Sequence, residues 1–197
     1  MSEPAVAELD TTPVESESTT DLGMYSDAAS GGKLGSSDIM VLEMVQPGDP
    51  AFTRSRMLLV MNAKTKGDDS GLKRYLDDLM SRPENQYNPL VLVEYGRYYV
   101  NRGDYQRALD KATLAERHWA RIPPELIFLK KTEIYEIEAA AYQGLFYQSE
   151  NNTELLEKAI KGWQKYRDHV KTKARADLLG RADKEISKLE TIQARLR

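Results

Sequence analysis

Few residues of this 197-residue chain could perform catalytic chemistry. It has two histidines, His118 and His169, and no cysteine. Both histidines stand near the ends of expected helices, where the helix dipole favours a protonated ring, so we expect structural or surface roles for them. The absence of cysteine excludes disulfides, zinc-thiolate sites and a thiol nucleophile. The sequence also lacks the HExxH, GxSxG and phosphate-loop patterns.

Three carboxylates lie close together in EIYEIEAAAY (133–142), at Glu133, Glu136 and Glu138. Such a cluster could bind a metal ion if a facing helix supplied histidines or matching carboxylates. No E-x-x-H pair is present to complete a di-iron type of site. We therefore predict no metal site, no cofactor and no enzymatic activity.

The C-terminal residues 158–197 could instead bind an anionic partner, because twelve bases face only five acids there. A basic helical face is typical of nucleic-acid binding. Acids interrupt this face, however, and the sequence pI is about 5.6. We interpret it as the solvated face of a terminal helix and keep nucleic-acid or acidic-surface binding as the alternative. The bases are Lys158, Lys161, Lys165, Arg167, Lys171, Lys173, Arg175, Arg181, Lys184, Lys188, Arg195 and Arg197.

The N-terminal part is acidic and poor in large apolar residues. Residues 1–50 hold ten acids and one base, a charge of about -9, which leaves about +6 for the rest of a chain with net charge -3. Residues 1–36 lack the apolar area that would offset the entropy of ordering, so we predict a disordered acidic tail. The start of the sequence has no apolar signal-peptide core and no segment suits a membrane span, which favours a cytoplasmic location.

Residues 37–50 form an apolar segment and linker, with Ile39, Met40, Val41, Leu42 and Met44 followed by a Pro-Gly turn. The run is too short to distinguish a strand from one or two helical turns. Residues 38–46 could cover the first helix of the domain, or they could occupy a groove in this chain or in a second copy. The second possibility would allow self-association.

Residues 51–197 predict an all-α domain. Helix-capping residues, turn glycines and prolines separate amphipathic stretches, and no stretch shows sustained period-2 alternation. The expected helices are about 50–66, 70–81, 88–102, 104–121, 124–148, 154–170 and 173–196.

The helices come in pairs, and the pair at 88–123 resembles a tetratricopeptide repeat. The resemblance is carried by Leu92, Gly96, Tyr99, Gly103, Tyr105, Ala108, Ala112 and Ala115. Small Gly96 and Ala108 let the two helices approach closely, bulky Tyr99 and Tyr105 fill the space around them, and Gly103 permits the tight turn.

The flanking helix pairs match the same repeat more weakly. Gly67, Gly71, Tyr75 and Pro83 fit the first repeat, and Ala139, Tyr142, Ala159, Trp163 and Tyr166 fit the third. The resemblance covers about 52–170 and implies a short right-handed α-solenoid of about three helix-turn-helix pairs. The amphipathic helix 173–196 would cap its C-terminal end.

The resemblance also implies a function, because tetratricopeptide repeats bind peptides or helices of protein partners in the groove lined by the first helix of each pair. Arg97 stands where the carboxylate-clamp variant of the family has its key asparagine, so that clamp is not expected here. The implied groove positions are Arg56, Val60, Ala63, Lys64, Val93, Arg97, Val100, Asn101, Glu136, Ala140 and Gln143.

The sequence therefore predicts a non-enzymatic adaptor or scaffold that binds a protein partner within a multiprotein complex. The mixed aliphatic and basic groove suits an apolar or amphipathic peptide with some acidic character. The N-terminal arm could modulate binding. The pattern leaves Tyr98 unassigned between the groove and the repeat core.

Overall fold

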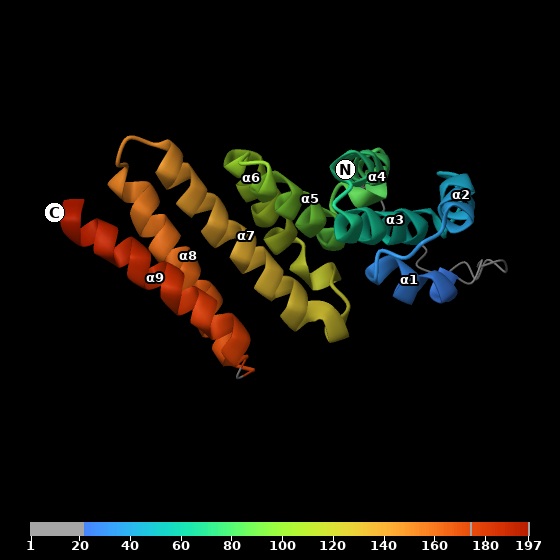
Figure 1. The fold of residues 1–197 in the computed structure, drawn as a ribbon. Coiled ribbons are helices and arrows are strands. Elements are labelled where there is room, and N and C mark those ends of the chain that lie inside the picture. The colour runs from blue at the N-terminus through green and yellow to red at the C-terminus, as the bar shows by residue number, and fades with distance from the viewer. Residues whose placement is uncertain (1–21, 174, 197) are drawn as a thin grey trace, which may run out of the picture.

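The computed structural model describes residues 22–173 and 175–196, and these residues form helices connected by turns, without strands. The chain advances from α1 and α2 at one end of the molecule to α9 at the other (Figure 1). The α-helices are α1 (Ser26–Ser30), α2 (Ser36–Met44), α3 (Phe52–Lys66), α4 (Asp69–Met80), α5 (Pro89–Asn101), α6 (Tyr105–Arg117), α7 (Ile127–Gln148), α8 (Thr153–Lys171) and α9 (Ala176–Leu196). The all-α prediction is confirmed for the described residues.

Local capping residues set the ends of these helices. The side chain of Asn88 accepts a hydrogen bond from the amide of Leu90 at the start of α5, and Asn152 does the same for Leu155 at the start of α8. Gly103 has φ of 72°, in the left-handed region that favours glycine, and it turns the chain from α5 into α6. The expected fourth and fifth helices are shorter than predicted, because 119–121 and 124–126 are 3-10 turns.

Successive helices pack against each other, α3 on α4, α5 on α6, and α7 on both α6 and α8, with α9 covering α8. Small residues lie where the helices come closest. A Cβ atom on Gly96 would lie 3.2 Å from two methyl groups of Ile137 on α7. A Cβ atom on Gly162 would lie 2.9 Å from the Cα atom of Ala139.

The other positions of the repeat pattern also lie inside the helix layers. Tyr99 is half-buried and stacks on Tyr95, and Tyr105 fills the space above Gly144. Gly71 is buried at the start of α4, where its amide donates to Asp68. The alanines Ala108, Ala115, Ala139 and Ala159 are fully buried.

The structure corrects the prediction of a disordered tail for residues 22–36. Leu22, Ala29 and Leu34 are buried and pack against α3. The amide of Leu34 donates to the Asn62 side chain over 3.2 Å, and the Lys66 ammonium donates to the Leu34 carbonyl over 3.1 Å. This segment is ordered because Leu22, Ala29 and Leu34 pack on one neighbouring helix, which composition alone does not reveal. Residues 1–21 of the predicted tail lie outside the described residues.

The ambiguous apolar segment is a helix, α2. Leu42 is fully buried where α2 packs on α3, whereas Met40 and Met44 are 62% and 67% exposed. The segment therefore covers the first long helix of its own chain, and it does not line the groove described below. Self-association through residues 38–46 stays a prediction.

Candidate functional site

Six of the predicted groove residues line one cavity of about 280 Å³, at Lys64, Arg97, Val100, Asn101, Glu136 and Ala140. A neighbouring cavity of about 270 Å³ contains Gln143. The two cavities share Val100, Ala140 and Arg181, so we treat them as one groove and use that word for their lining residues. Besides the residues already named, the lining includes Ile137, Tyr105, Gly144, Tyr147, Trp163, Glu185 and Lys188.

Four predicted groove residues, Arg56, Val60, Ala63 and Val93, are instead buried. Val60 and Val93 are fully buried in the core clusters around α3 and α5, and Ala63 is also buried. Their helices are rotated so that these side chains point between layers. A partner cannot contact them without unfolding the domain, so the prediction was wrong at these positions.

Arg56 is buried because it joins α2 to α3. Its guanidinium donates to the backbone carbonyls of Leu42, Glu43 and Val45, where α2 ends, over 2.7, 3.1 and 3.3 Å. Its Nε donates to Asp78 on α4 over 3.1 Å. The last carbonyls of a helix have no partner within the helix, so this arginine satisfies acceptors that would otherwise be buried without a donor.

Tyr98 belongs to the core rather than to the groove. It is 7% exposed and makes an edge contact with Tyr95 and with Tyr99, with ring centroids 6.5 and 5.6 Å apart. Most of the aromatic residues in EYGRYYVNRGDY therefore hold α5 against its neighbours.

Hydrogen bonds fix the floor of the groove near Gln143. The indole Nε1 of Trp163 donates to Oε1 of Gln143 over 2.7 Å, and the amide nitrogen of Gln143 donates to Glu185 over 2.7 Å. The Arg181 guanidinium lies 5.5 Å from the Trp163 ring. Residues from α7, α8 and α9 thus hold each other in one arrangement, which is the preorganisation that a binding surface needs.

A chain of ion pairs runs along the groove from α3 to α9. Within it, three cation–carboxylate pairs are joined by hydrogen bonds: Lys64 with Glu94 at 2.7 Å, Lys130 with Glu133 at 2.7 Å, and Arg181 with Glu136. Because each pair except Lys130–Glu133 connects two helices, the chain of charges also joins neighbouring helix pairs.

Among the carboxylates of these ion pairs, Glu94 is the most buried, with its side chain 6% exposed. Burial alone would raise the pKa of Glu94, but the nearby ammonium groups of Lys64 and Lys130 outweigh burial and hold the pKa below its usual value. The carboxylate is therefore charged at neutral pH, and it holds Lys64 at the edge of the groove.

Arg97 differs from the other cations of the groove. It lies 3.4 Å from Glu133 and 3.6 Å from Glu136, and its side chain is 32% exposed. Both carboxylates are hydrogen-bonded to other cations, and Arg97 makes no hydrogen bond anywhere in residues 22–173 and 175–196. Its N–H donors remain available to a partner.

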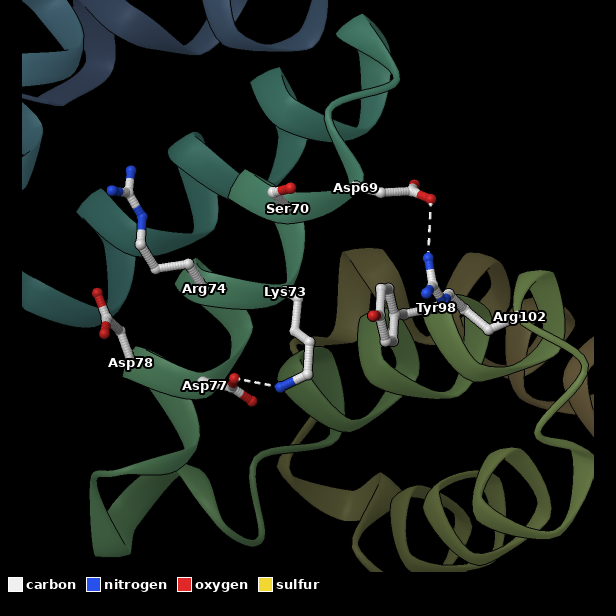
Figure 2. Close-up of a pocket in the computed structure, with 8 residues that line it drawn as sticks. All are labelled: Asp69, Ser70, Lys73, Arg74, Asp77, Asp78, Tyr98 and Arg102. Atoms are coloured by element: carbon white, nitrogen blue, oxygen red, sulfur yellow. Dashed lines mark hydrogen bonds and ion pairs between the residues drawn. The ribbon is translucent and has the colours of Figure 1, made fainter.

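A larger cavity, of about 460 Å³, lies between α4 and the C-terminal end of α5. Figure 2 shows that Lys73 points toward Asp77 on the same helix, and that Arg102 reaches across to Asp69. The remaining charges, Arg74 and Asp78, pair with Glu43 and Arg56 outside the cavity. Every charge lining this cavity thus has a partner.

Sequence reasoning missed the contribution of α9 to the groove. Arg181, Glu185 and Lys188 lie on the groove side of α9, and the resemblance treats this helix only as a cap. Their spacing of four and three residues places them on one face of a helix, so this polar face was the available signal.

The candidate catalytic residues have structural partners. His169 contacts the carbonyl of Phe128 through Nε2 at 3.1 Å and stacks on the Phe128 ring, and the His118 ring lies 5.2 Å from that of Tyr87. Glu138 accepts a hydrogen bond from Lys165. In the described part of the chain, no group of histidine, aspartate and glutamate side chains is placed to hold a metal ion.

Several of the C-terminal bases are ion-paired, which reduces the charge available to a nucleic acid. Lys158, Lys165 and Arg175 lie 2.6 to 2.9 Å from carboxylate oxygens. Arg167 and Arg181 also have acidic neighbours. Separately, none of the described helices is both long enough and apolar enough to cross a membrane.

Comparisons of the chain with protein-family models, curated proteins and solved structures gave no match.

Proposed function

We propose that this protein is a non-enzymatic adaptor that holds a peptide or helix of a protein partner in the groove. The observation that carries the proposal is the groove itself, an open surface to which α3, α5, α7, α8 and α9 each contribute side chains. Apolar Val100, Ile137 and Ala140 lie beside exposed cations there. A mixed lining of this kind suits an amphipathic segment, whose apolar side chains give affinity and whose charges give specificity.

The resemblance of residues 88–123 to a tetratricopeptide repeat supports the same proposal. In a short right-handed solenoid of stacked helix pairs, the first helix of each pair would face the groove, as α5 and α7 do. We extend the proposal to a cytoplasmic protein that works within a multiprotein complex, with α9 as both cap and groove wall.

A peptide-display selection against the full chain tests this function. Peptides selected on the wild type should bind it in solution and should lose binding to Ala140→Trp, because the indole fills the shared part of both cavities. Thr113→Trp is the matched control, since Thr113 is exposed on α6 and does not line the groove. Selected peptides that bind Ala140→Trp as well as the control, or a failure to select any peptide, would contradict the proposal.

The N-terminal arm is proposed to modulate binding. A deletion of the whole arm up to residue 47 would not test this cleanly, because it would also remove the buried residues Leu22, Leu34 and Leu42 and so destabilise the fold. Deleting residues 1–21 keeps these three residues in the chain. We expect this shorter deletion to strengthen binding of an acidic peptide, because residues 1–21 contain six acids and no base. Equal affinity of the two chains would exclude such modulation.

Nucleic-acid binding through α8 and α9 is the alternative, and a salt titration separates the two. Phosphate contacts would make affinity fall steeply with salt, whereas a peptide held in the groove by apolar contacts and one or two ion pairs would show a shallow dependence.

A further inference from the structure

The ion-pair chain of the groove contains one more cation than carboxylates. Its cations are Lys64, Lys130, Arg97 and Arg181, and its carboxylates are Glu94, Glu133 and Glu136. Each of the three carboxylates accepts a hydrogen bond from one of these cations, and each bond comes from a different cation. Arg97 is the cation that remains.

The position of Arg97 makes this surplus charge accessible. Its guanidinium lines the 280 Å³ cavity, is 32% exposed, and forms no hydrogen bond to any described residue. A guanidinium presents a planar fork of donors that matches the two oxygens of a carboxylate. Its Nη1 lies 3.4 Å from Glu133 and its Nη2 lies 3.6 Å from Glu136, so these carboxylates orient the guanidinium without forming a hydrogen bond to it.

We propose that Arg97 binds the carboxylate of an aspartate or glutamate side chain of the partner peptide. Val100, Ile137 and Ala140 line the same cavity and would contact an apolar residue next to that acid. The inference rests on the proposed function and deepens it, since it names the residue type that the groove selects.

The local charge balance favours a carboxylate over a phosphate. One surplus positive charge matches a monoanion. A phosphoserine carries about -1.5 to -2 at neutral pH. Its additional charge would meet Glu133 and Glu136 within one side-chain contact of Arg97. We therefore assign the site to an acidic peptide. The test below includes a phosphorylated peptide, whose tighter binding would contradict this assignment.

Two peptide-display libraries test the inference. They are identical except that one encodes aspartate and glutamate, and the other replaces both with asparagine and glutamine. We expect the acid-containing library to yield peptides whose binding is lost in Ala140→Trp, with an acid enriched at one position next to an apolar residue. If the acid-free library yields such peptides equally well, the inference fails and the proposed function stands. If neither library does, both fail.

Variants of Arg97 then locate the acid-binding residue. Arg97→Gln should weaken a selected acidic peptide about tenfold to a hundredfold, the loss expected for a hydrogen bond between charged groups. It should leave the affinity of the same peptide with glutamine at the acid position nearly unchanged. Arg117→Gln, an exposed arginine on α6, is the matched control.

Arg97→Lys keeps the charge but not the planar fork, so it should give an intermediate loss. An equal loss for the acidic and glutamine peptides in Arg97→Gln would indicate a merely structural role and overturn the inference. Tighter binding of a peptide with phosphoserine at the acid position would overturn the assignment to a carboxylate.

Discussion

Arg56 on α3 and Arg97 on α5 are the two arginines at groove positions implied by the sequence, yet the two regions around them differ. Arg56 is 7% exposed and donates hydrogen bonds to three backbone carbonyls and to Asp78. Arg97 is 32% exposed and makes no hydrogen bond in the part of the chain that the structure describes. An arginine at an implied groove position is therefore not always available to a partner, because a neighbouring segment can use its donors first.

The segment that makes this difference is α2. Its C-terminal end takes the donors of Arg56 on α3, whereas Arg97 on α5 lines the groove. The N-terminal end of the molecule is thus an anchored region, and the surface across α5, α7 and α9 is an available one. The following experiments test that contrast.

The largest expected effect is a difference in the free energy of unfolding between a substitution at a buried valine and one at a groove valine. Val93→Asp places a charge in a fully buried position without a partner, so we expect it to lower the free energy of unfolding by about 4 kcal/mol or more. Val100→Asp on the groove should cost less, about 1 to 2 kcal/mol, because Val100 is only partly buried and lines the groove beside Arg97. Urea unfolding followed by circular dichroism measures both. Similar losses would mean that α5 is rotated differently.

The second largest effect is a difference in the free energy of unfolding between alanine variants of Arg56 and Arg97. Arg56→Ala leaves the last carbonyls of α2 without their donor, and we expect a loss of about 3 kcal/mol in the free energy of unfolding. Arg97→Ala removes only partly exposed ion pairs and should cost less than about 1 kcal/mol. Hydrogen exchange should also show faster exchange in α2 for Arg56→Ala alone. If the α2 amides of that variant exchange as slowly as those of the wild type, Arg56 does not anchor α2.

A smaller, pH-dependent effect is expected at Glu94. Its folded-state pKa is depressed, so its ion pairs stabilise the fold above the unfolded pKa, near 4.5, and this contribution is lost as pH falls through the folded value. Glu94→Gln should therefore be less stable than the wild type at pH 7, by about 1 to 2 kcal/mol. The difference should shrink below about pH 4.5 in a series of urea titrations. A constant difference down to pH 3 would rule out this ionisation as its source.

The smallest effect is expected in the cavity of Figure 2. Arg102 and Asp69 are 53% and 68% exposed, and such pairs contribute about 0.5 kcal/mol or less. Arg102→Ala should leave both the free energy of unfolding and peptide affinity within error of the wild type. A loss of peptide affinity in this variant, measured by fluorescence anisotropy, would place the binding surface on α4 and α5 instead.

The sequence predicted the helices well because their ends depend on local chemistry. Asn88, Asn152 and Gly103 act within one turn of their own helix, so neighbouring residues suffice to predict them. Order in residues 22–36 depends instead on contacts of Leu22 and Leu34 with a distant helix. Composition cannot report such contacts.

The groove was only partly predictable for a similar reason. Residues four apart on a helix differ by about 40° in direction, so Val93 and Arg97 share a stripe in the sequence pattern. The crossing of α5 with its neighbours decides which of them faces the groove, and it buries Val93. The use of Arg56 by α2 is equally non-local, because its partners lie eleven to fourteen residues earlier.

The most direct test of the account is an NMR titration of the full chain with a display-selected acidic peptide. We expect shifts in the amide signals of Val100, Ala140 and Arg181 and in the guanidinium signal of Arg97. The signals of Arg56, Val60 and Val93 should change little. Shifts concentrated on α2, on the cavity between α4 and α5, or on the outer basic faces of α8 and α9 would contradict it.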